Sequence, residues 1–223
     1  MTSRKLGLGA IVGTLTASLV LAFAVTATPA ADAHSGHGAD TDKAAFHDAM
    51  RKLWADHIMW TRQFIVSAAT ESGNLADIGP TTDRLLTNQA DIGNALKPFY
   101  GDAAGNQVTA LLRDHILTAA ELVAAAKAGD AVAVKNASAA WYQNADDIAT
   151  ALNGLNPKHW PLAEMKAHMK DHLDLTLKEA VARLQGRYAD DIAAYDAIHT
   201  QILGMADMLS DGIVAQFPAK FSR

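Results

Sequence analysis

The spacing of apolar residues is the feature that most constrains the fold of this chain. From residue 42 onward they recur at intervals of three and four, which is the period of an amphipathic α-helix. No stretch alternates with period two over the length of a β-strand. The pattern therefore predicts an all-α fold.

Glycine, proline and short polar stretches interrupt this pattern. The interruptions predict six helices, at residues 43–72, 81–98, 103–128, 131–153, 162–186 and 190–216. Thr81, Asp102 and Asp130 stand where N-cap residues are expected, which supports three of the helix starts. Short connections make consecutive helices antiparallel, so we expect an up-and-down six-helix bundle.

The first 33 residues have the pattern of a secretory signal peptide. Arg4 and Lys5 precede an uncharged run over residues 6–31, and Ala-Asp-Ala at residues 31–33 is a small-x-small cleavage pattern. An uncleaved membrane anchor is the alternative, because about 26 uncharged residues can span a bilayer. We favour cleavage after Ala33, which leaves no membrane span in an exported protein, either secreted or associated with the cell wall.

The rest of the chain divides into a flexible N-terminal tail at 34–42, the bundle at 43–218 and a C-terminal tail at 219–223. The chain has no cysteine, which excludes disulfides, thiolate metal sites and a cysteine nucleophile. Its formal net charge of −5, without a basic cluster, indicates no binding to nucleic acid. The motifs of phosphate-binding loops, serine hydrolases and zinc proteases are absent from the sequence, so we expect no nucleotide cofactor.

A repeat of about 57 residues is visible within the predicted bundle. The dipeptide Asp-His occurs three times, as Asp56-His57, Asp114-His115 and Asp171-His172. The intervening helices carry a matching pair, Asn88 with Asp91 and Asn144 with Asp147. In the last helix His199 falls where the asparagine would stand. The repeat predicts three helical hairpins arranged with pseudo-threefold symmetry.

The polar residues of this repeat fall on the apolar stripes of their helices. His57, His115, His172 and His199 each stand at three-and-four spacing among apolar residues, as do Asn88 and Asn144. Alternate helices run in the same direction, so these side chains should lie at one height. The sequence thus predicts a polar belt inside the bundle.

Two interpretations of the belt compete, since buried polar groups must be satisfied by each other or by something bound. In the first, neutral imidazoles converge on copper or zinc, and Asp56, Asp114 and Asp171 act as further ligands or as hydrogen-bond acceptors. In the second, the histidines, asparagines and aspartates, including Asp91 and Asp147, form a network that fixes the register of the helices. Catalysis without metal is a third possibility.

Several motifs also resemble those of a known set of proteins. These are Asp-His-Ile-Met-Trp-Thr-Arg at 56–62, Asn-Gln-Ala-Asp-Ile-Gly-Asn at 88–94, and Leu-Ser-Asp-Gly-Ile at 209–213 followed by Gln-Phe-Pro. Together they resemble uncharacterised small exported all-helical proteins of Gram-positive bacteria. The resemblance covers nearly the whole chain after the signal peptide. It implies export and a helical fold, and it assigns no functional residue.

From the sequence we therefore expect an exported helical bundle that binds copper or zinc through His57, His115, His172 and His199. The alternative is a metal-free structural or interaction protein of the cell envelope, in which the belt is purely architectural. Neither interpretation makes the protein an enzyme.

Overall fold

The computed structural model describes residues 35–70 and 73–222, with side chains from residue 40 onward. The predicted signal peptide lies outside the described residues. The elements of the described part are α1 (Ser35–Ala68), α2 (Ile78–Ala128), α3 (Ala131–Leu155), α4 (Leu162–Leu184), α5 (Tyr188–Gln216) and the short 3-10 helix η1 (Pro218–Phe221). No strand occurs among these residues, so the all-α prediction is confirmed.

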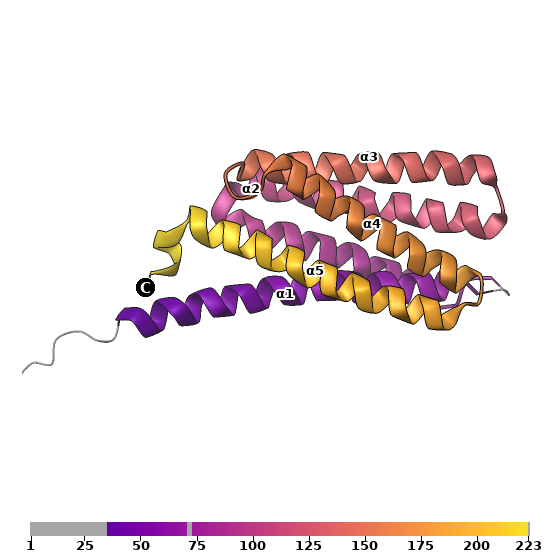
Figure 1. The fold of residues 1–223 in the computed structure, drawn as a ribbon, viewed down its shortest axis with the longest axis horizontal. Coiled ribbons are helices and arrows are strands. Elements are labelled where there is room, and N and C mark those ends of the chain that lie inside the picture. Colours follow the sequence, from indigo (N-terminus) through magenta and orange to yellow (C-terminus); the bar gives the residue numbers. More distant parts are fainter. Residues whose placement is uncertain (1–34, 71–72, 223) are drawn as a thin grey trace, which may run out of the picture. The chain divides into compact units, whose positions relative to one another are not determined.

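The helices pack as a ring of neighbours around a common core (Figure 1). Helix α1 contacts α2 and α5, α3 contacts α2 and α4, and α4 contacts α5. Side chains from all five helices and from η1 form the core, with Met50, Trp54, Trp160 and Ile202 among those buried. None of the helices in the described part has the length and hydropathy needed to cross a membrane.

The prediction of six helices is wrong, because α2 continues through the expected break. Within α2, Gly101 has φ 83° and ψ 168°, and the helix reverses direction there (Figure 1). We call residues 78–100 the first arm of α2 and residues 102–128 the second arm. One non-helical glycine reverses the chain without a separate loop, since glycine adopts positive φ at little cost. Five helices do not divide into three two-helix hairpins, so the predicted hairpin repeat is not supported.

The two arms of α2 pack unusually closely. A Cβ atom on Gly93 would lie 2.5 Å from the carbonyl oxygen of Gly105. Real Cβ atoms do not approach backbone oxygens at that distance, so glycine is required at position 93. The close approach holds the arms together just before and after the reversal.

The chain ends also differ from expectation. Helix α1 begins at Ser35, so most of the expected N-terminal tail is helical. Phe221 is buried, and its ring centre lies 5.2 Å from that of Phe46 and 5.7 Å from that of Phe99. The expected C-terminal tail therefore closes one end of the core. The sequence pattern missed this because η1 is too short to show a helical period.

Of the three expected N-caps, one is confirmed. The Asp130 carboxylate accepts hydrogen bonds from the backbone N–H groups of Val132 and Ala133, at 3.0 and 2.9 Å. Thr81 and Asp102 lie inside α2 instead. The Thr81 N–H donates to the Asp77 carbonyl oxygen at 2.9 Å, and Asp102 directly follows the non-helical Gly101 at the start of the second arm.

Candidate functional site

Three of the four predicted histidines come together in the core. His57 on α1, His115 on the second arm of α2 and His172 on α4 are only 2, 3 and 3% exposed. The ring centre of His172 lies 5.6 Å from that of His57 and 6.4 Å from that of His115. We call these three side chains the histidine cluster. The sequence pattern predicted this meeting of three distant segments.

His199 does not belong to the cluster. Its side chain is exposed, and its ring lies 6.5 Å from that of Tyr195 on the same helix. The buried stripe of α5 passes through Ile198 and Ile202 instead. Successive residues on a helix point about 100° apart, so a one-residue error in placing the stripe moves a side chain to the surface.

Side-chain amides bind the δ nitrogens of two cluster histidines. His57 Nδ1 lies 3.2 Å from Gln89 Oε1, and His115 Nδ1 lies 2.9 Å from Asn144 Oδ1. An amide oxygen only accepts hydrogen bonds, so each Nδ1 carries the proton and donates it. The lone pair of each ring is therefore on Nε2.

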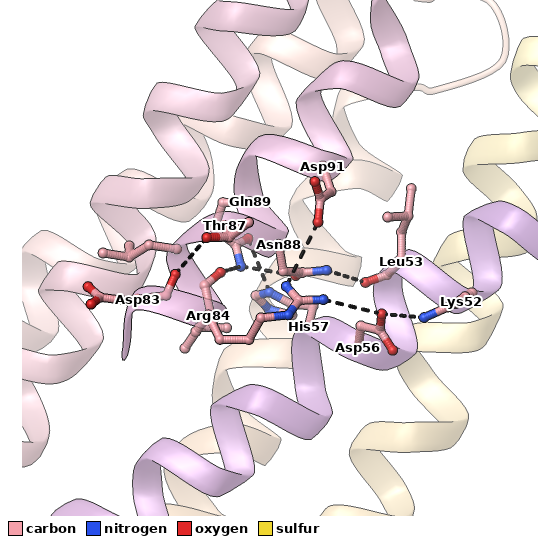
Figure 2. Close-up of polar contacts among 12 residues, drawn as sticks. Lys52, Leu53, Asp56, His57, Asp83, Arg84, Thr87, Asn88, Gln89 and Asp91 are labelled. Atoms are coloured by element: carbon pink, nitrogen blue, oxygen red, sulfur yellow. Dashed lines mark hydrogen bonds and ion pairs between the residues drawn. The ribbon is translucent and has the colours of Figure 1, made fainter. Parts of the chain in front are cut away.

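The orientation of these amides follows from their other hydrogen bonds. The Gln89 amide nitrogen donates to the Leu85 carbonyl oxygen at 2.8 Å and to Asn88 Oδ1 at 3.1 Å. Both of its N–H groups are thus occupied, and its oxygen is left to face His57 (Figure 2). This arrangement is the kind that sets the tautomer of metal-binding histidines.

A second type of amide contact recurs at all three histidines. Each donor amide binds the backbone carbonyl four residues before a cluster histidine: Asn88 to Leu53 at 3.0 Å, Asn144 to Leu111 at 3.1 Å, and Gln201 to His168 at 3.0 Å. On α5 the equivalent of Asn88 and Asn144 is therefore Gln201, and the predicted equivalent, His199, does not make this contact. The sequence comparison missed Gln201 because glutamine replaces asparagine there and the spacing shifts by one residue.

Several buried polar atoms around the cluster have no hydrogen-bond partner among the described residues. These are His172 Nδ1, Gln201 Oε1, Trp54 Nε1 and Trp141 Nε1. The Trp141 ring stacks on His115 with centres 5.4 Å apart, and the Trp54 ring lies 5.8 Å from His57. Unpaired buried polar groups are costly, so the histidine cluster has hydrogen-bonding capacity that the fold itself does not use.

Burial keeps the three imidazoles neutral at pH 7. Loss of solvent lowers the pKa of His57 well below its usual value, and the neighbouring His172 and His115 lower it further. Burial and the nearby His172 lower the pKa of His115 to about 3. Burial lowers the pKa of His172 to about 4, although the neighbouring Gln201 side chain opposes this. A neutral imidazole is the form that binds metal ions.

The predicted aspartates point away from the cluster. Asp56 forms an ion pair with Lys52 at 2.6 Å, and Arg84 lies 3.8 Å from both Asp56 and Asp91 (Figure 2). Asp114, Asp147 and Asp171 are exposed. The described contacts therefore give no support to Asp56, Asp114 and Asp171 as ligands or hydrogen-bond acceptors at the cluster, and neighbouring helical residues face about 100° apart.

The ring separations in the histidine cluster approach those of a metal site built from three histidines, and one of them is larger. Three Nε2 atoms bound to one ion at about 2.0–2.1 Å would place the ring centres about 5.5 Å apart. The His57–His172 separation of 5.6 Å fits this geometry, and the His115–His172 separation of 6.4 Å exceeds it. Within residues 35–70 and 73–222 no group of three or more His, Asp or Glu is already arranged to hold a metal ion.

A second buried polar cluster was not predicted. Arg62 Nη1 lies 2.6 Å from Glu179 and 2.7 Å from Asp191, and both carboxylates are 1% exposed. Burial raises the pKa of Glu179 to about 7, although Arg62 opposes this. These residues lie on α1, α4 and α5, so the ion pairs tie three helices together. No motif in the sequence indicated that they meet.

Comparison of the chain with protein-family models, with curated proteins and with solved structures found no match. The argument for function therefore depends on the histidine cluster.

Proposed function

We propose that this chain is an exported helical-bundle protein that binds one transition metal ion, copper or zinc, at the histidine cluster. The observation that supports this most is the state of the three imidazoles: buried, neutral, and contributed by three different helices. In two of them the proton is on Nδ1, which leaves Nε2 available for a metal. Export is proposed from the signal-peptide pattern of residues 1–33.

The chemistry of the cluster favours a singly charged ion. Among the residues that the structure describes, no carboxylate forms a hydrogen bond or ion pair with the three rings, so a bound ion would keep its full charge inside the core. Burying a double charge costs more than burying a single one. Met169, a buried soft side chain, also lies one turn before His172 on α4. We therefore expect Cu(I) to bind more tightly than Zn(II).

Binding requires the rings to move closer together. The separation of 6.4 Å between His115 and His172 must shorten by about 1 Å for all three Nε2 atoms to share one ion. Gln201 is the amide beside His172, but His172 Nδ1 forms no hydrogen bond of the length and geometry that hold the other two rings. His172 is thus the ring with the most freedom to turn toward the ion.

The second candidate is the metal-free architectural network. It is favoured by the three recurring bonds from an amide to a backbone carbonyl, which join α1 to α2, α2 to α3 and α4 to α5. These bonds fix helix register whether or not a metal is present. They leave the indole N–H groups of Trp54 and Trp141 without a described partner, however, and His172 with only a weaker contact to Gln201, which a purely structural network would not.

Titration of the purified protein with Cu(I) and with Zn(II), followed by elemental analysis after desalting, tests the proposal. We expect one equivalent of metal in the wild type and its loss in His172→Gln. His199→Gln is the matched control, because it removes an exposed histidine outside the cluster and should keep the metal. Failure of the wild type to retain either ion, or equal retention by both variants, would refute metal binding and leave the architectural network.

A further inference from the structure

The reversal inside α2 is made by one residue (Figure 1). Gly101 is the only residue of α2 with non-helical backbone angles, so residue 100 ends the first arm and residue 102 begins the second. The connections between the other α-helices take two residues or more. A change in the angles of Gly101 alone would therefore turn α2 into a straight helix of 51 residues, about 75 Å long.

The sequence around the reversal is compatible with a straight helix. Ala103 and Ala104 follow it closely, and alanine has the highest helix propensity. Pro98 is already accommodated inside α2. Lys220 on η1 donates to the carbonyl oxygen of Pro98, a group that in a straight α2 would bind the N–H of residue 102. Straightening thus replaces a side-chain contact by a helical hydrogen bond.

The two arms contact each other symmetrically around the reversal. A Cβ atom on Gly93 would meet both Gly105 and Thr109, and Arg113 donates to the Leu86 carbonyl oxygen at 3.3 Å. Along the chain, the midpoints of these pairs lie at about residues 99–101. Two straight, antiparallel copies of α2 would form the same pairs twice, on either side of a twofold axis near Gly101. A second copy can therefore supply the opposite arm.

The part of the chain before the reversal holds together by its own contacts. We call α1 and the first arm of α2 the N-terminal unit. Asn88 on the first arm donates to the Leu53 carbonyl oxygen on α1 at 3.0 Å, and Gln89 binds His57 at 3.2 Å. These bonds stay within the N-terminal unit wherever the rest of the chain lies.

The contacts between the N-terminal unit and the rest of the chain do not require a single chain. Arg51 forms an ion pair with Asp207 on α5 at 2.5 Å, and Arg62 forms one with Glu179 on α4 at 2.6 Å. These residues are far from Gly101 along the sequence. The same ion pairs can therefore form between two copies with unchanged geometry.

We propose that this chain also forms a domain-swapped dimer, in which Gly101 is helical, α2 is straight and each N-terminal unit packs on the other copy. Each histidine cluster then combines His57 of one copy with His115 and His172 of the other. The exchange keeps the contacts of the fold and costs the association of two chains, so it is favoured at high protein concentration. The proposal does not depend on metal binding at the cluster.

Refolding from urea over a range of protein concentrations, followed by size exclusion with light scattering, tests the proposal. We expect the wild type to be monomeric when refolded dilute and to form a species of twice the mass when refolded concentrated. Gly101→Ala should form mainly the dimer, because alanine does not readily adopt φ 83° and ψ 168° and favours a helix more than glycine does. Gly129→Ala is the matched control. Gly129 also has positive φ, but it lies in a two-residue connection, so this variant should behave like the wild type.

Cross-linking distinguishes a swapped dimer from association through the surface. The chain has no cysteine, so Arg51→Cys with Asp207→Cys introduces two unique thiols at a contact that crosses the reversal. A short bismaleimide reagent should join two chains in the dimer, as seen on a denaturing gel. In the monomer it should form a link within one chain.

A longer connection provides a second test that does not depend on the folding of Gly101→Ala. Insertion of Gly-Ser-Gly-Ser after Gly101 relieves the tight reversal and should remove the dimer that the wild type forms when refolded concentrated. A wild type that is monomeric at every refolding concentration would overturn the proposal. So would a dimer whose cross-links stay within each chain, or a dimer fraction that the insertion leaves unchanged.

Discussion

We expect acid to destabilise the folded protein through its histidine cluster, and substitution of His172 isolates the contribution of one histidine. The perturbation is a change from pH 7.5 to pH 5.0, applied to the wild type and to His172→Gln. Burial lowers the pKa of His172 to about 4 in the folded state. In the unfolded chain a histidine has a pKa of about 6.5. Between these two values the unfolded state binds more protons, so stability falls as the pH drops below about 6.5.

The size of the effect follows from the two pKa values. At pH 7.5 His172 is neutral in both states and contributes almost nothing. At pH 5.0 it is charged in the unfolded chain and still neutral in the fold, which costs about 2 kcal/mol of stability. Over this interval the wild type should therefore lose about 2 kcal/mol more than His172→Gln. His172 also lowers the pKa values of His57 and His115, so its removal should flatten the pH dependence further.

Glu179 acts in the opposite direction and cancels in the comparison. Burial raises its pKa to about 7, so the folded state binds the additional proton between about pH 4.5 and pH 7. That contribution makes the fold more stable as the pH falls, and it is lost above pH 7. Glu179 is present in both proteins, so its contribution drops out of the difference. The wild-type curve alone would hide part of the histidine effect.

Urea unfolding at intervals of half a pH unit, in buffer with a metal chelator, gives the free energy of unfolding of each protein. The control is His199→Gln, whose histidine is exposed and should leave the pH dependence as in the wild type. Parallel curves for wild type and His172→Gln, each with the same loss between pH 7.5 and 5.0, would refute the reasoning. They would mean that His172 is charged in the fold or open to solvent.

Three further predictions concern packing and can be checked by urea unfolding at pH 7. Gly93→Ala should lower the free energy of unfolding by about 1–3 kcal/mol, because the new Cβ would press on the backbone of the other arm of α2. Gly154→Ala is the control and should not destabilise the protein, because the space around Gly154 is open. Arg62→Ala should lower the free energy of unfolding by about 3 kcal/mol, because it leaves the buried Glu179 without its ion-pair partner and leaves Asp191 with only Arg183, at 3.4 Å. Phe221→Ala should cost about 3 kcal/mol by opening a cavity at the end of the core, and a result near zero would show that η1 is not part of the folded unit.

Part of the site was predictable because its signal is local. His57, His115 and His172 fall at three-and-four spacing among apolar residues, and that spacing alone places a side chain on the buried face of its helix. The equal spacing of the three along the chain then indicated that they meet. Asp130 was predictable for the same reason, since an N-cap is a contact within one turn.

Other parts depended on contacts that have no local signal. Gln201 replaces Asn at a shifted position, and only the shared contact with the carbonyl before a cluster histidine reveals its equivalence. The pair of Arg62 with Glu179 joins residues 117 positions apart.

By itself, the sequence determined that this protein is helical and that His57, His115 and His172 lie on the buried faces of their helices, because each follows from the 3.6-residue period of a single helix. Only the tertiary structure decided that α2 reverses at Gly101 without a separate loop, that His199 is outside the cluster and that Asp114, Asp147 and Asp171 are exposed. These outcomes depend on the rotation of each helix against its neighbours. That rotation is set by close packing between distant residues, to which local periodicity is insensitive.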